Sequence, residues 1–465
     1  MQIYNDLTRQ KEEFIPLEPG KAKIYACGPT VYNYFHIGNA RCFVIFDMFR
    51  RYLEYRGYDV TFVQNFTDVD DKMIKKANEE GVTVADIAER YIKEYYTDAE
   101  GLGIRKATVH PRATENIGQI IGLVSKLVKT GHAYAVENGD VYFRTRSFDH
   151  YGCLSHMPIE DLESGARIAV DEIKEDPLDF ALWKGAKPGE PSWPSPWGQG
   201  RPGWHIECSA MVKRYLGDTI DIHCGGVDLT FPHHENEIAQ SEAATGKKFA
   251  NYWMHNGFIN VDNQKMSKSL NNFFTVRDVA EKYGYPAIRY FLLSSHYRKP
   301  INYSVDIIEA SKNAVERIQN CADNLAFYLR NAKDGEELSS EKRAVFEGYK
   351  NAFIEKMDDD FNTADAVTAL FEIVRELNSL IADGASKQAV KEAGDVFLEL
   401  GNLMGFIGEI KVDKELSDRI EAMIEERAKA KKEKNYARAD EIRNELTSMG
   451  VTLMDTPLGT KWKIE

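Results

Sequence analysis

The chain of 465 residues is too long for a single hydrophobic core, and about three domains of roughly 150 residues each are expected. Its composition is that of a globular protein, and it shows neither an apolar run for a signal peptide nor the ~20 apolar residues of a membrane helix, which favours the cytoplasm. The formal charge of −14 argues against non-specific coating of nucleic acid, although local basic patches can still hold a nucleic-acid partner.

The first predicted elements are a strand, a helix and a second strand between residues 23 and 66. Ile24 and Ala26 alternate as in a strand, and a turn with Gly28 and Pro29 follows. A helix then begins near Gly38, with one buried face made by Cys42, Val44, Ile45, Met48, Phe49, Tyr52 and Leu53. Its first N–H groups suit a phosphate, although neither common nucleotide-loop motif is present.

The polar residues 65–72 follow the second strand and allow two interpretations. Their carboxylate and amide groups are compatible with a metal site, but helix capping by Asp68 or Asp70 is the favoured interpretation. Two amphipathic helices are predicted next, over residues 84–100 and 114–130.

Residues 132–200 change in character. Tyr134 and the apolar run 141–143 predict strands, and a Pro/Gly-rich stretch closes the region. Such a stretch is usually a flexible linker, but three tryptophans between residues 190 and 204 indicate an ordered loop. We therefore expect residues 115–200 to be an insertion between two halves of a nucleotide-binding fold.

The second half of that fold is predicted from residue 204 onward, with a helix over 204–211 and strands over 219–223 and 257–261. A polar stretch without periodicity covers 263–272, and from about residue 304 the pattern is almost wholly helical. Thr363 is expected to cap one of these helices.

Cysteine, histidine and glutamate side chains in the two halves suggest a metal site. His233 and Glu237 are four residues apart and share a helical face, while Cys27 ends the first strand and Cys208 lies on a separate helix. Buried structural cysteines are the alternative, because no paired-cysteine spacing is present. Rival ligands are Cys224, His205, His223 and His234, and His234 is expected to face away from His233 if the segment is helical.

Several of these residues together resemble a known family. Cys27-Gly-Pro-Thr-Val-Tyr leading to His36-Ile-Gly-Asn39, with Lys265-Met-Ser-Lys-Ser269, is similar to the two signatures of class I aminoacyl-tRNA synthetases. The stretches 204–211 and 225–240 narrow the resemblance to cysteinyl-tRNA synthetases, and it extends over nearly the whole chain. Asn39 replaces the second histidine of the family signature, and its amide can bind phosphate without carrying charge.

The resemblance implies an enzyme that activates L-cysteine with ATP to cysteinyl-adenylate and transfers it to the 3′ end of tRNA(Cys). It implies one Zn²⁺ per chain, bound by Cys27, Cys208, His233 and Glu237, which selects the substrate thiolate over the hydroxyl of serine. It also implies Mg²⁺ bound with ATP.

The same resemblance assigns roles around the substrates. His36 and Asn39 would contact the ATP phosphates, and Gly38 would let the adenine approach closely. Lys265 and Lys268 would stabilise the developing charge, and Met266 and Ser267 would complete that ATP-binding loop. Asp228 would hold the substrate ammonium, with Thr67 and Trp204 around the amino acid.

A basic run near the C-terminus is the candidate tRNA contact, since it combines positive charge with an aromatic ring. A solvated helix face is the alternative on composition alone. Tyr436 stands where the family often has a tryptophan, which preserves stacking but not the indole N–H donor. The expected contacts are Lys431, Lys432, Lys434, Tyr436 and Arg438.

The expected fold is α/β: a Rossmann-like, doubly wound parallel-sheet catalytic domain in two halves (1–114 and 201–260) around a connective insertion (115–200). A contact region for the tRNA stem (261–303), an all-α bundle (304–411) and a small anticodon-binding domain (412–465) follow. A monomer is expected.

Two alternative functions are a ligase that joins cysteine to an amino-sugar acceptor, and a zinc- and RNA-binding protein without catalysis. The helical C-terminal region favours tRNA over an amino sugar as the acceptor. The intact His36, Lys265 and Lys268 disfavour a binding protein without catalysis.

Overall fold

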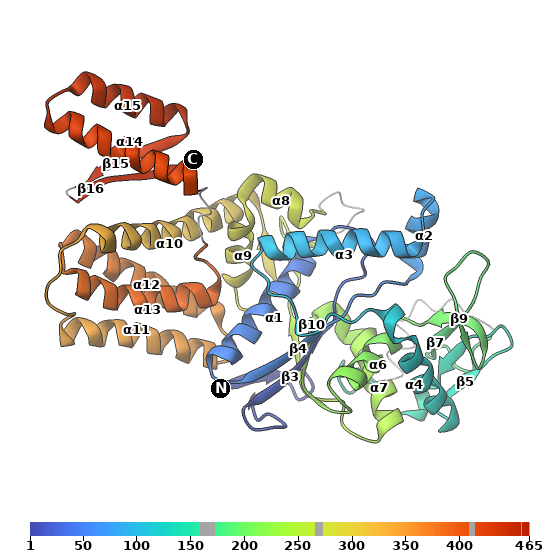
Figure 1. Ribbon diagram of the computed structural model, residues 1–465. Coiled ribbons are helices and arrows are strands. Elements are labelled where there is room, and N and C mark those ends of the chain that lie inside the picture. The colour runs from blue at the N-terminus through green and yellow to red at the C-terminus, as the bar shows by residue number, and fades with distance from the viewer. Residues whose placement is uncertain (159–172, 266–272, 409–413, 457, 465) are drawn as a thin grey trace. The chain divides into compact units, whose positions relative to one another are not determined.

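The computed structural model describes residues 1–158, 173–265, 273–408, 414–456 and 458–464. It divides into two compact units, of which the first comprises Met1–Val315 with Ile354–Val367, and the second Glu316–Phe353 with Thr368–Glu465. Among the described helices, none combines the length and apolar character needed to cross a bilayer. Figure 1 shows the elements of each unit coloured along the chain.

A four-stranded parallel sheet forms the centre of the first unit, with strand order β11-β10-β3-β4. The chain enters the sheet at the middle strand β3, adds β4 on one side, and later adds β10 and β11 on the other. The loop after β3 therefore runs toward β4, and the loop after β10 runs toward β11, on the other side. Parallel α/β sheets bind their ligands at the carboxyl end of the strands between two such loops. The strands are β3 (Lys21–Ala26), β4 (Asp59–Gln64), β10 (Ile220–Gly226) and β11 (Ala250–Asn256).

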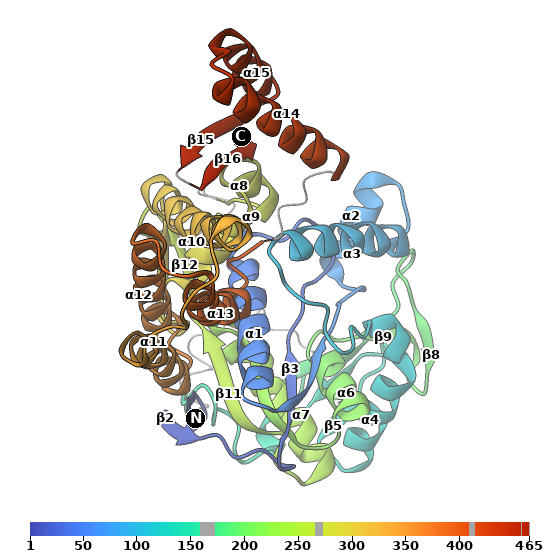
Figure 2. The same ribbon diagram turned by 60° about the vertical axis from the view of Figure 1, so that its left-hand side comes forward.

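Helices cover both faces of this sheet, as the two views show (Figures 1 and 2). Helix α1 (Ile37–Tyr55) packs on one face, and all seven apolar residues predicted for its inner face are buried. The other face is covered by α4 (Ile117–Lys129), α6 (Ile206–Tyr215) and α7 (Glu235–Thr245), whose apolar side chains share a core with Tyr25 and Val63 of the sheet. The doubly wound parallel fold predicted from the sequence is confirmed.

Two further helices, α2 (Asp71–Glu80) and α3 (Val84–Gly101), follow β4. Asp70 caps α2 by accepting a hydrogen bond from the Met73 N–H (2.9 Å), which confirms capping for this residue. Asp68 instead accepts from the backbone N–H of Thr114 (3.0 Å) and ties the start of α2 to the segment before α4.

The region between the two halves of the sheet folds into a five-stranded antiparallel sheet, with order β5-β6-β7-β9-β8. The Pro/Gly-rich stretch is ordered, as predicted, because it forms β8 and β9. Trp183 is fully buried in this sheet and lies against Trp197 at 6.2 Å between ring centroids. The strands are β5 (Ala133–Ala135), β6 (Val141–Phe143), β7 (Phe180–Gly185), β8 (Trp193–Ser195) and β9 (Gly198–Pro202).

Two smaller sheets complete the first unit. An N-terminal hairpin pairs β1 (Gln2–Asn5) with β2 (Gln10–Glu13). After β11, a three-stranded sheet is joined by helices α8 (Val276–Tyr283) and α9 (Tyr285–Leu293), with strands β12 (Ile259–Val261), β13 (Gln264–Lys265) and β14 (Ile301–Tyr303).

The remaining chain is helical, as predicted, up to a final hairpin. Its helices are α10 (Val305–Asn331), α11 (Ser340–Asp358), α12 (Thr363–Ala382), α13 (Lys387–Met404), α14 (Lys414–Lys432) and α15 (Tyr436–Ser448), followed by β15 (Val451–Thr456) and β16 (Gly459–Ile464). The expectation that Thr363 caps a helix is wrong by one residue. Asn362 Oδ1 accepts from the Asp365 N–H (3.2 Å), and the buried Thr363 hydroxyl has no hydrogen-bond partner in the described parts of the chain.

Candidate functional site

A pocket of about 500 Å³ lies at the edge of the sheet where β3 and β10 end. The turn after β3 and the start of α1 form one wall, and residues after β10 and β11 form the other. The pocket is lined by Cys27, Gly28, Pro29, Thr30, Tyr32, Asn33, Tyr34, Phe35, His36, Gly38, Asn39, Cys42, Phe43, Lys72, Trp204, Gly226, Asp228, Leu229, Asn256, Gly257, Phe258, Ile259 and Phe273.

Six sequence-predicted site residues are on these walls: Cys27, His36, Gly38, Asn39, Trp204 and Asp228. Thr67 is not among the described lining residues. It is buried, and its hydroxyl donates a hydrogen bond to Glu207 (3.1 Å), so it lies behind the pocket wall. Trp204 is 46% exposed and lies over His233, with ring centroids 4.4 Å apart.

The start of α1 is set by His36, which is its N-cap. The His36 Nδ1 accepts a hydrogen bond from the Asn39 N–H (3.2 Å), so the imidazole holds the first turn of the helix at the pocket wall. The Ile37 N–H donates to Phe274 O (3.3 Å), and the dipole of the helix leaves its positive end at the pocket, the electrostatic condition for an anionic substrate.

The four predicted metal ligands meet at the base of the pocket, and all are buried. Cys27 Sγ lies 3.9 Å from Cys208 Sγ and 3.5 Å from Glu237 Oε1. His233 Nε2 lies 3.6 Å from Cys208 Sγ and 3.1 Å from Glu237 Oε1. The four ligand atoms are all within 4.8 Å of one another, so one ion can be reached by all of them. Two thiols, an imidazole and a carboxylate are a donor set suited to zinc.

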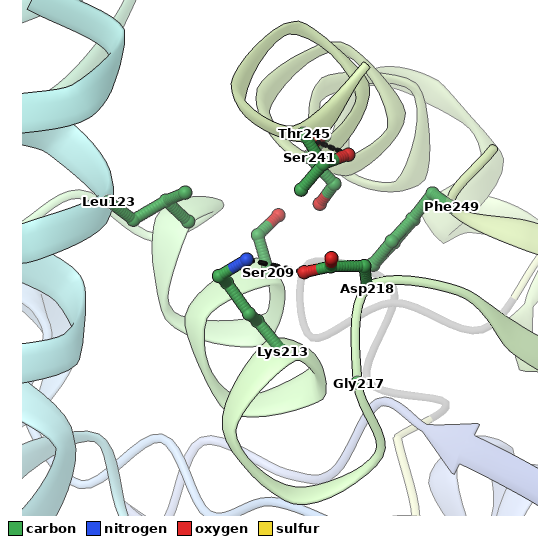
Figure 3. Close-up of a pocket in the computed structure, with 8 residues that line it drawn as sticks. All are labelled: Leu123, Ser209, Lys213, Gly217, Asp218, Ser241, Thr245 and Phe249. Atoms are coloured by element: carbon green, nitrogen blue, oxygen red, sulfur yellow. Dashed lines mark hydrogen bonds and ion pairs between the residues drawn. The ribbon is translucent and has the colours of Figure 1, made fainter. Parts of the chain in front are cut away.

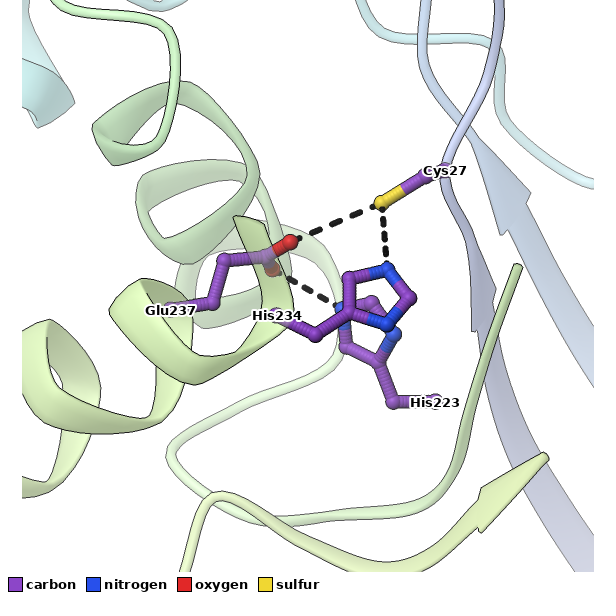
Figure 4. A group of neighbouring side chains, drawn as sticks. All are labelled: Cys27, His223, His234 and Glu237. Atoms are coloured by element: carbon purple, nitrogen blue, oxygen red, sulfur yellow. Dashed lines mark hydrogen bonds and ion pairs between the residues drawn. The ribbon is translucent and has the colours of Figure 1, made fainter. Parts of the chain in front are cut away.

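A second group of four, Cys27, His223, His234 and Glu237, satisfies the same distance limit (Figure 4). His234 Nε2 lies 3.3 Å from Cys27 Sγ, and His223 Nε2 lies 2.8 Å from Glu237 Oε2. His233 and His234 lie in an irregular turn before α7, which begins at Glu235, and their ring centroids are 5.7 Å apart. The regular helix on which His234 was expected to face away from His233 is therefore not present there. Two rivals named from the sequence are therefore next to the predicted ligands.

The two other rivals belong to neither group. The Cys224 thiol donates to the backbone oxygen of Tyr25 (3.4 Å). His205 Nδ1 lies 2.9 Å from His233 Nδ1, and this contact orients the His233 ring with its Nε2 toward Cys208 and Glu237.

The electrostatics of the cluster differ between its ligands: the pKa values of Cys208 and Glu237 are lowered, whereas burial raises the pKa of Cys27. Burial lowers the pKa of His233, but its hydrogen bonds with Cys208 and Glu237 outweigh this and raise the pKa to about 10. The hydrogen bond from Cys27 lowers the pKa of Cys208 to about 7, with a further contribution from His233. Burial raises the pKa of Glu237, but His223 and His233 outweigh it and hold that pKa at about 2. A thiolate and a carboxylate are the forms that bind a metal ion, so Cys208 and Glu237 fit one directly, and a bound cation would displace the protons of Cys27 and His233.

A second, very small cavity lies apart from this site (Figure 3). Its volume of about 10 Å³ is the space of one water molecule. The ion pair between Lys213 and Asp218 lies on its wall, and Ser241 Oγ has no hydrogen-bond partner among the described residues. This cavity is too small for a substrate.

Sequence reasoning missed Lys72 and Phe258 as pocket residues. Lys72 is the one lysine or arginine among the described lining residues, and its ammonium lies 5.5 Å from the centre of the Tyr32 ring. Its position as the second residue of α2, two residues after the Asp70 cap, was the signal available in the sequence. Phe258 is 41% exposed and follows β11 on the opposite wall.

Of the predicted ATP loop, Lys265 is among the described residues. The backbone of Lys265 is paired with Asn260 between β13 and β12. Met266, Ser267 and Lys268 lie outside the described residues.

The predicted tRNA contacts lie around the junction of α14 and α15. Lys431 pairs with Asp455 (2.6 Å), and Arg438 pairs with Glu426 (2.8 Å) and Glu441 (2.6 Å). Lys432 and Lys434 are exposed, and Tyr436 is 63% exposed. The exposed lysines and the tyrosine are the groups best placed to meet another molecule.

Comparison with solved structures supports the fold. A methionyl-tRNA synthetase of Mycobacterium tuberculosis in complex with methionyl-adenylate matches with a TM-score of 0.63 at 16% identity, over 83% of this chain and 91% of that chain. A leucyl-tRNA synthetase from Agrobacterium radiobacter, in a ternary complex with tRNA and LeuAMS, matches with a TM-score of 0.59 at 12% identity, over 84% of this chain and 86% of that one.

Comparison with protein families identifies the chain more closely. The family described as tRNA synthetases class I (C) catalytic domain matches residues 13–313, and the DALR domain matches 352–408. The cysteinyl-tRNA ligase anticodon binding domain matches residues 413–462, which favours tRNA over an amino sugar as the acceptor of cysteine. Together with the match to the catalytic domain, it favours an enzyme over an RNA-binding protein without catalysis. The chain belongs to the cysteinyl-tRNA synthetases of class I and acts as a cysteine–tRNA ligase.

Proposed function

We propose that Cys27, Cys208, His233 and Glu237 hold one Zn²⁺ and that this ion distinguishes cysteine from serine. The observation that carries the proposal is the mutual approach of four buried ligand atoms within 4.8 Å at the base of a pocket that Cys27 also lines. When bound, zinc supplies a soft Lewis acid that favours a thiolate over a hydroxyl.

The set with Cys208 is preferred over the set with His223 and His234 for two reasons. It contains two thiols, the softer donors, and the Cys208 thiol already has a pKa near 7. His234 is in addition engaged through Nδ1 with His255 Nε2 (2.8 Å), and His223 with Glu237, so both suit an outer role that orients the ligands.

The walls of the pocket suggest how cysteine and ATP are bound. Asp228 is proposed to hold the substrate ammonium, and the exposed face of Trp204 to cover the side chain. Thr67 is proposed to support this part of the pocket through Glu207. The attacking group is the carboxylate of cysteine itself, so no side-chain base is required, and positioning with charge stabilisation accounts for the chemistry.

ATP is proposed to bind at the start of α1, with its phosphates near His36 and Asn39 and its adenine over Gly38. Lys265 and Lys268 would stabilise the charge that develops on the phosphates, with Met266 and Ser267 in the same loop. Mg²⁺ is expected to accompany the ATP phosphates.

The C-terminal region is proposed to bind the anticodon of tRNA(Cys). Lys432, Lys434 and Tyr436 are exposed there, and Lys431 and Arg438 would exchange their carboxylate partners for phosphates. We further propose the domain limits and roles given from the sequence, and a monomeric enzyme that acts in the cytoplasm.

The metal assignment is tested by two matched substitutions. Cys208→Ser should lose bound zinc together with cysteine-dependent ATP–pyrophosphate exchange, whereas His234→Gln should keep zinc. Bound metal is measured by elemental analysis and exchange by radiolabelled pyrophosphate. Zinc retained by Cys208→Ser and lost by His234→Gln would assign the ion to the second group instead.

A further inference from the structure

Arg41 is a buried cation that the reaction described so far does not use. It lies in the second turn of α1, three residues after Gly38, and its side chain is fully buried. No carboxylate is among the hydrogen-bond partners that the structure shows for it in the described residues; all of them are backbone oxygens. Burial lowers the pKa of Arg41 to about 10, since no anion offsets the loss of water.

The guanidinium of Arg41 joins two segments that are far apart in the sequence. Its Nη1 donates to the carbonyl oxygens of Gly257 (2.9 Å) and Phe258 (2.7 Å). Its Nη2 donates to those of Lys299 (2.6 Å), Tyr297 (3.2 Å) and His296 (3.3 Å). Five carbonyl dipoles therefore replace a counter-ion, and a planar fork of N–H groups is what such a junction requires.

The first of these segments is part of the pocket wall. Asn256, Gly257, Phe258 and Ile259 all line the pocket, and Arg41 itself does not. Asn256 Oδ1 is buried without a hydrogen-bond partner among the described residues, so this wall carries an acceptor for a donor group of a substrate.

The second segment braces the first from behind. The Gly257 N–H donates to Tyr297 O (2.8 Å), and the Ile301 N–H donates to Phe258 O (3.0 Å). A Cβ on Gly257 would lie only 2.7 Å from the carbonyl oxygen of Lys299, so the two backbones approach more closely than a residue with a Cβ would allow. The position of the wall is therefore fixed by Arg41 and by this contact together.

We propose that Arg41 is a positioning residue for ATP, which fixes the wall formed by residues 256–259 at a set distance from the start of α1. A nucleotide that places its phosphates at the N-terminus of α1 has its base within reach of this wall, with Phe258 as an exposed aromatic surface and Asn256 as an acceptor. The inference rests on the proposed binding of ATP at the start of α1. Cysteine, expected between Cys27, Trp204 and Asp228, should be little affected.

Arg289 provides a matched control. It is also fully buried, burial also lowers its pKa to about 10, and it packs from α9 against α1. Its hydrogen bonds go to Asp47 (3.4 Å) and Leu102 O (3.0 Å), and it does not line the pocket.

The experiment compares Arg41→Lys, Arg41→Met and Arg289→Lys in the full-length enzyme by ATP–pyrophosphate exchange. Arg41→Lys keeps the charge but not the fork, and it should raise the KM for ATP at least tenfold, while the KM for cysteine and the bound zinc stay within twofold of the wild type. Arg41→Met should show the same selectivity with a larger effect. Arg289→Lys should lower the melting temperature without a selective change in the KM for ATP.

Hydrogen exchange at the Gly257 and Ile301 amides gives a second measurement, and it should accelerate in both Arg41 variants. An unchanged KM for ATP in folded Arg41→Lys, or an equal rise in Arg289→Lys, would overturn the positioning role; if Arg41→Met does not fold, Arg41→Lys carries the test. A His36→Ala variant with unchanged ATP kinetics would instead refute the proposed ATP site. Hydrogen exchange would then test on its own whether Arg41 fixes the wall formed by residues 256–259.

Discussion

The buried Cys/His/Glu cluster and the basic surface at the junction of α14 and α15 were both predicted from residue type, yet they are built differently. In the cluster each group lies within hydrogen-bond distance of another titratable group, away from water. On the surface the lysines either pair with a nearby carboxylate or face solvent. Charges in a buried cluster depend strongly on one another, whereas exposed charges act almost independently.

The largest effect is expected from a substitution of Cys27, because neither possible group of metal ligands can form without it. Cys27 belongs to both possible donor groups, so Cys27→Ser should abolish stoichiometric zinc and lower kcat/KM for cysteine by at least about a hundredfold, given the 10–100-fold typical even for outer partners of metal ligands. Cys42→Ser is the control, because Cys42 also lines the pocket but belongs to neither donor group. Equal zinc loss in the two variants would contradict the assignment.

His110 shows the effect of burial alone on the pKa of a histidine, since it is largely buried and lies away from the cluster. Its Nδ1–H faces Gln64 O (2.9 Å) and its Nε2 accepts from the Ala107 N–H (3.0 Å), so only the neutral ring fits. Burial lowers the pKa of His110 from 6.5 to about 4.

Between these two pKa values the unfolded chain binds a proton that the native chain does not. Stability should therefore fall as the pH drops from 6.5 to 4, by up to about 3 kcal/mol from this residue. Urea unfolding at several pH values, compared with His110→Gln, checks the prediction. The variant should lose stability less steeply across this interval, and parallel curves for the two proteins would argue against it.

His205 is expected to have an intermediate effect, because it contacts a proposed ligand but not the ion. Replacing it by alanine removes the partner of His233 Nδ1 and should weaken zinc binding by about 10- to 100-fold. Competition with a chromophoric chelator measures this affinity. His132→Ala, a histidine that contacts Ser147 within the insertion, should leave zinc affinity unchanged.

The smallest effect is expected on the basic surface. Lys434→Ala should raise the KM for tRNA only a few-fold and reduce the salt dependence of binding by a slope of about 0.7 to 1, without changing ATP–pyrophosphate exchange. Titrations of tRNA at several salt concentrations measure the slope. A loss of exchange activity would show that this residue does more than bind RNA.

Much of the fold could be predicted from the local periodicity of apolar residues. The buried face of α1, the strands β3, β4 and β10, and the first two strands of the insertion follow from apolar spacing, which depends on neighbours in the sequence. The central-sheet strand β11 and the insertion strands β7, β8 and β9 were not predicted. The cap of α12 was missed by one residue, since Asn362 and Thr363 are both good capping types and spacing does not choose between them.

The site was predictable only where its chemistry is carried by residue type. Cys27 at the end of β3 and the pair His233 and Glu237 suggested a metal site, the family resemblance implied the zinc ligands, and the structure brings the four together. The approach of His234 to Cys27 depends on the irregular turn before α7, and the contacts of Arg41 are with backbone oxygens, which every residue possesses. Neither leaves a distinctive pattern in the sequence.

His36 begins α1 and also stands on the pocket wall. One imidazole therefore caps the helix and, in the ATP site proposed above, also contacts the nucleotide, so a defect caused by its removal would have two origins that ordinary kinetics would merge. An asparagine at this position would preserve a cap acceptor while withdrawing the second ring nitrogen, and could disentangle the two contributions.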